Sequence, residues 1–101
     1  MNDWSPATKD DVLRAIADVA ADTGPDWVRY EERLIDPYPS TIERFGRREC
    51  AFVVARTATR VVFFDDIEET FGTATEEAGK LIYRADFGDL RLAIKEALAG
   101  G

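Results

Sequence analysis

Hydrophobic positions near the N-terminus recur with helical spacing. One apolar stripe that repeats about every 3.6 residues is formed by Val12, Leu13, Ile16, Ala17 and Ala20. Thr8 and Asp11 form a capping pair at its start, with the carboxylate near the positive end of the helix dipole. Gly24-Pro25 favours its termination. The pattern predicts a helix over residues 9–22.

The middle of the chain holds short runs of β-branched and aromatic residues between turn signals. These runs predict strands at residues 27–35, 41–45, 49–56, 60–65 and 80–85. Thr57–Thr59 is short enough for a hairpin, and residues 76–79 resemble a turn before the last strand. We expect a loop over residues 36–40, because its two prolines lack backbone donors.

The last segment predicts a second helix, with Asp86 as the N-cap and Asp89 in the first turn. Its apolar stripe consists of Phe87, Leu90, Ile94, Ala97 and Leu98. Short links between the strands indicate antiparallel pairing. We therefore expect a single α+β domain over residues 1–101: an antiparallel sheet of four or five strands with an N-terminal and a C-terminal helix packed on one face.

Composition narrows the chemistry. The 101 residues include no histidine and one cysteine, which excludes Ser-His-Asp and Cys-His catalysis and histidine-ligated metals. Cys50 lies in a predicted strand, so we expect a buried, inert thiol. No apolar run approaches the ~20 residues that cross a bilayer, and the N-terminus does not resemble a signal peptide. We expect a cytoplasmic protein with no enzymatic activity, cofactor or metal.

Negative charge is concentrated in one segment. The net charge is −7, and residues 65–77 hold six acidic residues and no basic one. A net acidic domain repels nucleic acid and anionic membranes, so a basic protein is the partner we expect. The candidate partner-binding residues are Asp65, Asp66, Glu68, Glu69, Glu76 and Glu77.

Two other interpretations of this acidic run stay open. It is a solvated rim that maintains solubility, or Asp65, Asp66, Glu68 and Glu69 offer oxygen ligands to Ca²⁺ or Mg²⁺, although the spacing of an EF-hand loop is missing. Strand alternation places Asp65 on the core face. A buried unpaired carboxylate is costly, so we expect a bend or bulge at residues 65–66.

Three further features have competing interpretations. Arg44, Arg47 and Arg48 bind an anion, pair with nearby acids or simply face solvent. Trp27 is an interface anchor or a core residue, and we expect it in the core; Trp4 lies in an N-terminal arm and serves either as an interface anchor or in packing.

Two segments carry a family resemblance. Residues 61–72, Val-Val-Phe-Phe-Asp-Asp-Ile-Glu-Glu-Thr-Phe-Gly, are followed by Phe87-Gly88-Asp89-Leu90 at the start of the final helix. This pattern resembles small acidic immunity proteins of bacterial polymorphic and contact-dependent toxin systems. The resemblance covers about a third of the chain. It implies a non-catalytic inhibitor that binds a cognate toxin, with the acidic run in a positive cleft as a phosphate mimic.

Two alternatives belong to other functional classes. An acidic secretion chaperone that holds an effector segment is also small and α+β, but it should be an obligate dimer with an exposed apolar groove. A small enzyme of unknown reaction would have to use carboxylate or arginine chemistry. The oligomeric state does not follow from the sequence.

Overall fold

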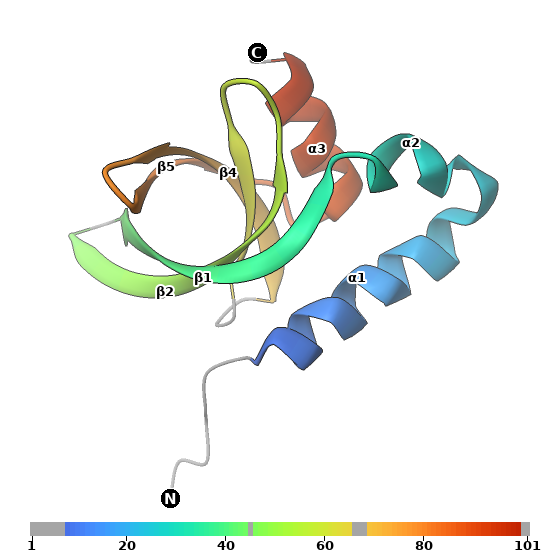
Figure 1. Ribbon diagram of the computed structural model, residues 1–101, viewed down its shortest axis with the longest axis horizontal. Coiled ribbons are helices and arrows are strands. Elements are labelled where there is room, and N and C mark those ends of the chain that lie inside the picture. The colour runs from blue at the N-terminus through green and yellow to red at the C-terminus, as the bar shows by residue number, and fades with distance from the viewer. Residues whose placement is uncertain (1–7, 45, 66–68, 100–101) are drawn as a thin grey trace, which may run out of the picture.

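The computed structural model of the protein describes residues 8–44, 46–65 and 69–99, and of Arg44 only the backbone (Figure 1). The elements in chain order are α1 (Lys9–Thr23), the 3-10 helix η1 (Gly24–Trp27), α2 (Val28–Glu31), β1 (Leu34–Arg44), β2 (Arg47–Arg56), β3 (Val61–Asp65), β4 (Thr70–Glu77), β5 (Lys80–Asp86) and α3 (Leu90–Ala99). The predicted α+β class, with a five-stranded sheet between an N-terminal and a C-terminal helix, is confirmed.

The sheet is a closed barrel in the order β1-β2-β3-β4-β5, so the predicted antiparallel sheet is confirmed for consecutive strands, and the parallel closing pair was not predicted. Consecutive strands pair antiparallel. Closure comes from a short parallel pairing of Thr41–Glu43 on β1 with Lys80–Ile82 on β5. Parallel neighbours need a long connection, and the intervening strands of the meander supply it. Short links between consecutive strands carry no information about this pairing of the first strand with the last.

Closure creates two hydrophobic clusters on the two sides of the sheet. The barrel interior contains Ile42, Ala51, Val53, Val61, Phe63, Ala74 and Leu81. The outer cluster joins β2, β3 and β4 to α1 and α3 through Val12, Ile16, Val54, Ala55, Val62, Phe64, Phe71, Leu90, Ala93, Ile94 and Ala97. The four apolar residues of β3 are therefore all buried, because alternate side chains enter different clusters, and Asp65 at the end of the strand is buried as well.

Gly72 in β4 permits a close approach inside the barrel. A Cβ atom at this position would lie 2.6 Å from the carbonyl oxygen of Ala85 and 2.7 Å from the ring of Phe63. The backbone of β4 and the largest buried side chain of the interior can share this space only because residue 72 has no side chain.

The first helix forms as predicted, but its buried face is rotated. The backbone N–H of Asp11 donates to the Thr8 hydroxyl at 3.2 Å, and the N–H of Thr8 donates to the Asp11 carboxylate at 3.0 Å, so the capping box is confirmed. Val12 and Ile16 are buried, whereas Leu13 is 43% exposed. The apolar stripe thus runs along Val12, Ala15, Ile16 and Val19, not through Leu13, Ala17 and Ala20.

The predicted strand over residues 27–35 is wrong except at its last two residues: residues 27–31 are helical, residues 32–33 form a turn, and β1 begins at Leu34. Gly24 ends α1 with φ 74°, and Pro25 then fits the first turn of η1, because its fixed φ suits a helix start. The indole N–H of Trp27 donates to the Glu31 carboxylate at 3.2 Å, one helical turn away. Local contacts of this kind outweigh the modest β-propensity of the segment. Trp27 packs against the outer cluster, as expected.

The predicted loop over residues 36–40 is part of β1, so this prediction is also wrong. Pro37 lies where the pairing of β1 with β2 shifts register, between Leu34 and Tyr38. Pro39 lies on the stretch of β1 that precedes its pairing with β5 at Thr41. Proline is tolerated at bulges and at strand edges, because no ladder donor is required there. Within the described residues, the N-terminal part of β1 pairs with β2 only, and the two prolines there also disfavour pairing with a further strand.

Two features of the C-terminal half differ from expectation. β4 was not predicted, because its acidic residues and Gly72 obscure the strand pattern; the turn that follows it is Ala78-Gly79, both with positive φ. The N-cap residue of α3 is Asp89 rather than Asp86. Its carboxylate accepts the backbone N–H of Arg91 at 2.7 Å and of Leu92 at 3.4 Å. Asp86 is the last residue of β5 and accepts a hydrogen bond from the Tyr83 hydroxyl.

Candidate functional site

The acidic run of residues 65–77 does not form one surface patch, because β4 lies within it. Thr70 pairs with Asp65 at one end of β4, and Glu77 pairs with Lys80 at the other. Eight residues of strand span about 23 Å at ~3.3 Å per residue. Asp65 and Glu69 therefore belong to one end of the barrel, and Glu76 and Glu77 belong to the opposite end.

The first end retains fewer exposed acids than the sequence indicated. Asp65 is only 3% exposed and stays in the ladder with Thr70 and Ala51, so the bend expected at residues 65–66 does not displace it, and its carboxylate is withdrawn from the surface. Asp66 and Glu68 lie outside the described residues. Glu69 is exposed, with a left-handed backbone at φ 56°. Of the described acids at this end, Glu69 is thus available to a partner.

At the opposite end, Glu76 is held by a network that crosses the barrel. Its carboxylate forms an ion pair with Arg56 at 2.9 Å and accepts a hydrogen bond from the Tyr38 hydroxyl at 2.5 Å. The Tyr38 hydroxyl in turn accepts a hydrogen bond from Arg56 at 2.5 Å. These bonds, with the Tyr38 contribution largest, lower the pKa of Glu76, whereas burial and the neighbouring carboxylate raise the pKa of Tyr38. The network is saturated by internal partners, which favours a structural role.

A second group of charges on β1, β2 and β5 is also internally paired. Glu43 contacts Lys80 at 3.4 Å and Arg48 at 3.2 Å, and the Lys80 charge is the main cause of its lowered pKa. Arg48 therefore pairs with a nearby acid and Arg47 is exposed without an ion pair among the described residues, as two of the three interpretations of the arginine cluster predicted; the side chain of Arg44 lies outside the described residues. Lys80 pairs with Glu43, and Glu77 remains exposed to solvent.

Exposed acids without an ion pair are found mainly on the helical layer. In the part of the chain that the structure describes, Asp10, Asp18 and Asp26 are exposed and have no ion pair. Asp22 of the same helix pairs with Arg91 of α3 at 3.2 Å. Helix periodicity alone does not mark these residues as a site.

Three other expectations concern chemistry at single residues. Cys50 is exposed, which corrects the prediction of a buried thiol: it lies on β2 opposite Thr41, outside both hydrophobic clusters. Trp4 lies outside the described residues. Within the described ranges, no three residues of the ligating types His, Cys, Asp and Glu come together as a metal site would require; two of the four proposed oxygen ligands, Asp66 and Glu68, fall outside those ranges.

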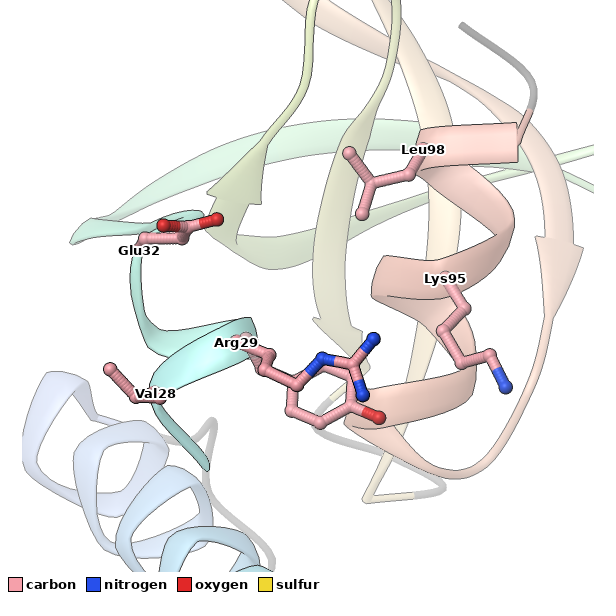
Figure 2. A pocket seen from close by; sticks show the side chains of 6 residues that line it. Val28, Arg29, Glu32, Lys95 and Leu98 are labelled. Atoms are coloured by element: carbon pink, nitrogen blue, oxygen red, sulfur yellow. The ribbon is translucent and has the colours of Figure 1, made fainter. Parts of the chain in front are cut away.

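A feature that the sequence analysis missed is a hollow between α2 and α3. It encloses about 450 Å³ and is lined by Val28, Arg29, Tyr30, Glu32, Lys95 and Leu98. Figure 2 shows Leu98 reaching from α3 toward α2 and Arg29 reaching from α2 toward α3. The strand predicted over residues 27–35 does not place Val28 and Arg29 beside the C-terminal helix, so the sequence pattern does not predict this hollow.

Among the helices described, none has both the length and the hydropathy needed to span a membrane. Comparison of the chain with models of protein families, with curated proteins and with solved structures gave no significant match.

Proposed function

We propose that the protein is a non-catalytic, protein-binding inhibitor of the immunity type, which neutralises a basic cognate toxin domain in the cytoplasm. The observation that carries this proposal is that exposed carboxylates without an ion pair outnumber cations without one in the described part of the chain. Of the described cations, Lys9, Arg14, Arg48, Arg56, Lys80 and Arg91 form internal ion pairs, whereas Arg29, Arg47, Arg60, Arg84 and Lys95 form none. Exposed acids such as Asp18, Glu69 and Glu77 have no such partner among the described residues.

An excess of unpaired surface carboxylates favours a partner of opposite charge. Such a surface accelerates association with a basic protein and repels polyanions. Because many toxins that act on nucleic acid have a positive cleft, carboxylates placed in that cleft would occupy the positions of substrate phosphates. The segment of residues 66–69 is the part of the acidic run that supports this role best, since Asp65 is buried and Glu76 is internally paired.

Co-expression tests the proposal directly. The toxin candidate is the protein encoded by the gene next to the one for this chain, expressed in a bacterial host from an inducible promoter. We expect growth arrest when that protein is expressed alone, recovery when both are expressed, and a complex that survives size-exclusion chromatography. A neighbouring protein that arrests growth but is neither bound nor neutralised by this chain would overturn the proposal.

The hollow between α2 and α3 favours a second candidate, the secretion chaperone, because exposed Val28 and Leu98 give its partly charged lining some of the apolar surface that such a protein needs for its effector segment. The two candidates differ in assembly. A chaperone of this class should be an obligate dimer, whereas an immunity protein can act as a monomer. Light scattering on the purified protein, at several concentrations, distinguishes them.

A further inference from the structure

The hollow between α2 and α3 exposes apolar side chains that neither hydrophobic cluster includes. Val28 is 65% exposed and Leu98 is 41% exposed. Both line the hollow, together with the half-buried Tyr30. The Tyr30 side chain also packs against the outer cluster. Apolar surface that borders a concavity is typical of a place where another molecule docks.

The same hollow carries positive charge that the rest of the molecule does not neutralise. Arg29 and Lys95 belong to its lining, and neither forms an ion pair within the described parts of the chain. Glu32 is the one carboxylate among its six lining residues. In a chain with a net charge of −7, two unpaired cations beside exposed apolar groups mark a local site for an anionic, partly apolar partner.

We propose that this hollow docks an acidic peptide segment of a partner protein, with one large apolar side chain inserted against Leu98 between α2 and α3. Carboxylates beside that side chain pair with Arg29 and Lys95. The volume of about 450 Å³ matches sites that hold a small ligand or a single anchoring group. A basic segment is disfavoured, because both cations would repel it. This site does not depend on the proposed function, because the hollow selects an acidic partner whereas the acidic surface selects a basic one.

Selection from a random peptide library displayed on phage tests the proposal with the full-length protein. We expect enrichment of peptides that combine Asp or Glu with Leu, Phe or Trp. Binding of the enriched synthetic peptide, measured by fluorescence anisotropy, should weaken about tenfold or more in Leu98→Asp and in the double variant Arg29→Glu, Lys95→Glu. Backbone amide shifts of the ¹⁵N-labelled protein should change at residues 28–32 and 95–98.

Matched controls separate this site from general effects. Leu92→Asp changes a leucine of the same helix that is 50% exposed and does not line the hollow, and Arg84→Glu reverses an exposed charge on β5. Both should leave peptide binding within about twofold, and all variants should keep the parent circular dichroism spectrum. Enrichment of basic peptides, failure to enrich any peptide, or equal losses in Leu92→Asp and Leu98→Asp would overturn the proposal. So would a concentration-dependent dimer that Leu98→Asp dissociates, because a second copy would then be the occupant.

Discussion

Arg56 on β2 and Glu76 on β4 form a 2.9 Å ion pair between two strands that are not neighbours in the sheet, since β3 lies between them. Tyr38 on β1 bonds to both and packs on the interior cluster, so the three side chains close one end of the barrel. A polar group at the end of an apolar interior stabilises the fold only while its partners are present. We therefore expect this network to stabilise the barrel at the end where β2 leads into β3.

Glu76→Gln should destabilise the fold by about 1–3 kcal/mol, because the amide cannot replace a charged acceptor of two hydrogen-bonding partners. Urea denaturation followed by circular dichroism measures the change. Glu77→Gln is the matched control. Glu77 is the exposed neighbour of Glu76, and removal of the Glu77 charge should alter the free energy of unfolding by less than about 0.5 kcal/mol. Equal effects of the two substitutions would show that the network contributes nothing.

The same network predicts a pH dependence. The pKa of Glu76 lies below its ordinary value of 4.5 in the folded protein, mainly because of the Tyr38 hydrogen bond. A carboxyl with a depressed folded pKa contributes stability above its unfolded pKa and loses it as the pH falls through the folded pKa. The difference in unfolding free energy between the parent and Glu76→Gln should therefore shrink as the pH falls from about 6 to about 3. A difference that is constant over this range would contradict the assignment.

Periodicity made the best predictions, and they concern elements with one local pattern. The first helix, with its capping box, and the hairpin at Thr57–Thr59 follow from neighbouring residues alone, and the Thr57 N–H indeed donates to the carbonyl of Arg60 at 2.8 Å. Pairing of β1 with β5 could not be predicted in this way. Its partners are about 40 residues apart, and no local pattern specifies which strands meet when a sheet closes.

The candidate site was predicted less well for a related reason. Acidic residues adjacent in sequence suggested one patch, but a strand extends its residues, so Glu69 and Glu77 lie at opposite ends of β4. Charge alone also did not distinguish Glu76, which is internally paired, from Glu77, which is exposed. Such a distinction depends on Arg56 and Tyr38, whose positions across the barrel follow from its closure.

Gly72→Ala should destabilise the protein by at least about 1–3 kcal/mol, because the added methyl group overlaps the Ala85 carbonyl and the Phe63 ring. Thermal and urea denaturation both report this change. The double variant with Phe63→Leu tests the cause: it relieves the clash with the ring but not the one with the backbone, so recovery should be partial. Full stability of Gly72→Ala alone would contradict the close packing.

Asp89→Ala should destabilise α3 by about 0.5–2 kcal/mol, because its carboxylate is the helix cap and also pairs with Arg91 at 2.7 Å. Asp89→Asn retains a capping acceptor while removing the charge. It should therefore recover most of the loss, since Asn caps helices about as well as Asp. If Asn and Ala were equally destabilising, the ion pair with Arg91 rather than the cap would be the main contribution.

Charge reversal tests the acidic surface of the proposed inhibitor. Asp66→Lys, Glu68→Lys and Glu69→Lys together should weaken binding to the cognate toxin by several kcal/mol, whereas single exposed acids contribute less than about 1 kcal/mol. Association should be fast at low salt and slow markedly as salt rises, because charges farther apart than about 10 Å are screened at 0.1 M. Calorimetry gives the affinity and surface binding gives the rates.

A matched triple variant separates a local interface from net charge. Asp18→Lys, Asp26→Lys and Glu96→Lys change the protein's charge by the same amount at exposed acids outside the segment of residues 66–69. General steering alone would slow association equally in both triples, with no change in dissociation. An interface at residues 66–69 instead requires faster dissociation in the first triple only. If the first triple stays folded by circular dichroism and binds the toxin as tightly as the parent, the acidic run is a solvated rim and the interface lies elsewhere on the barrel or its helices.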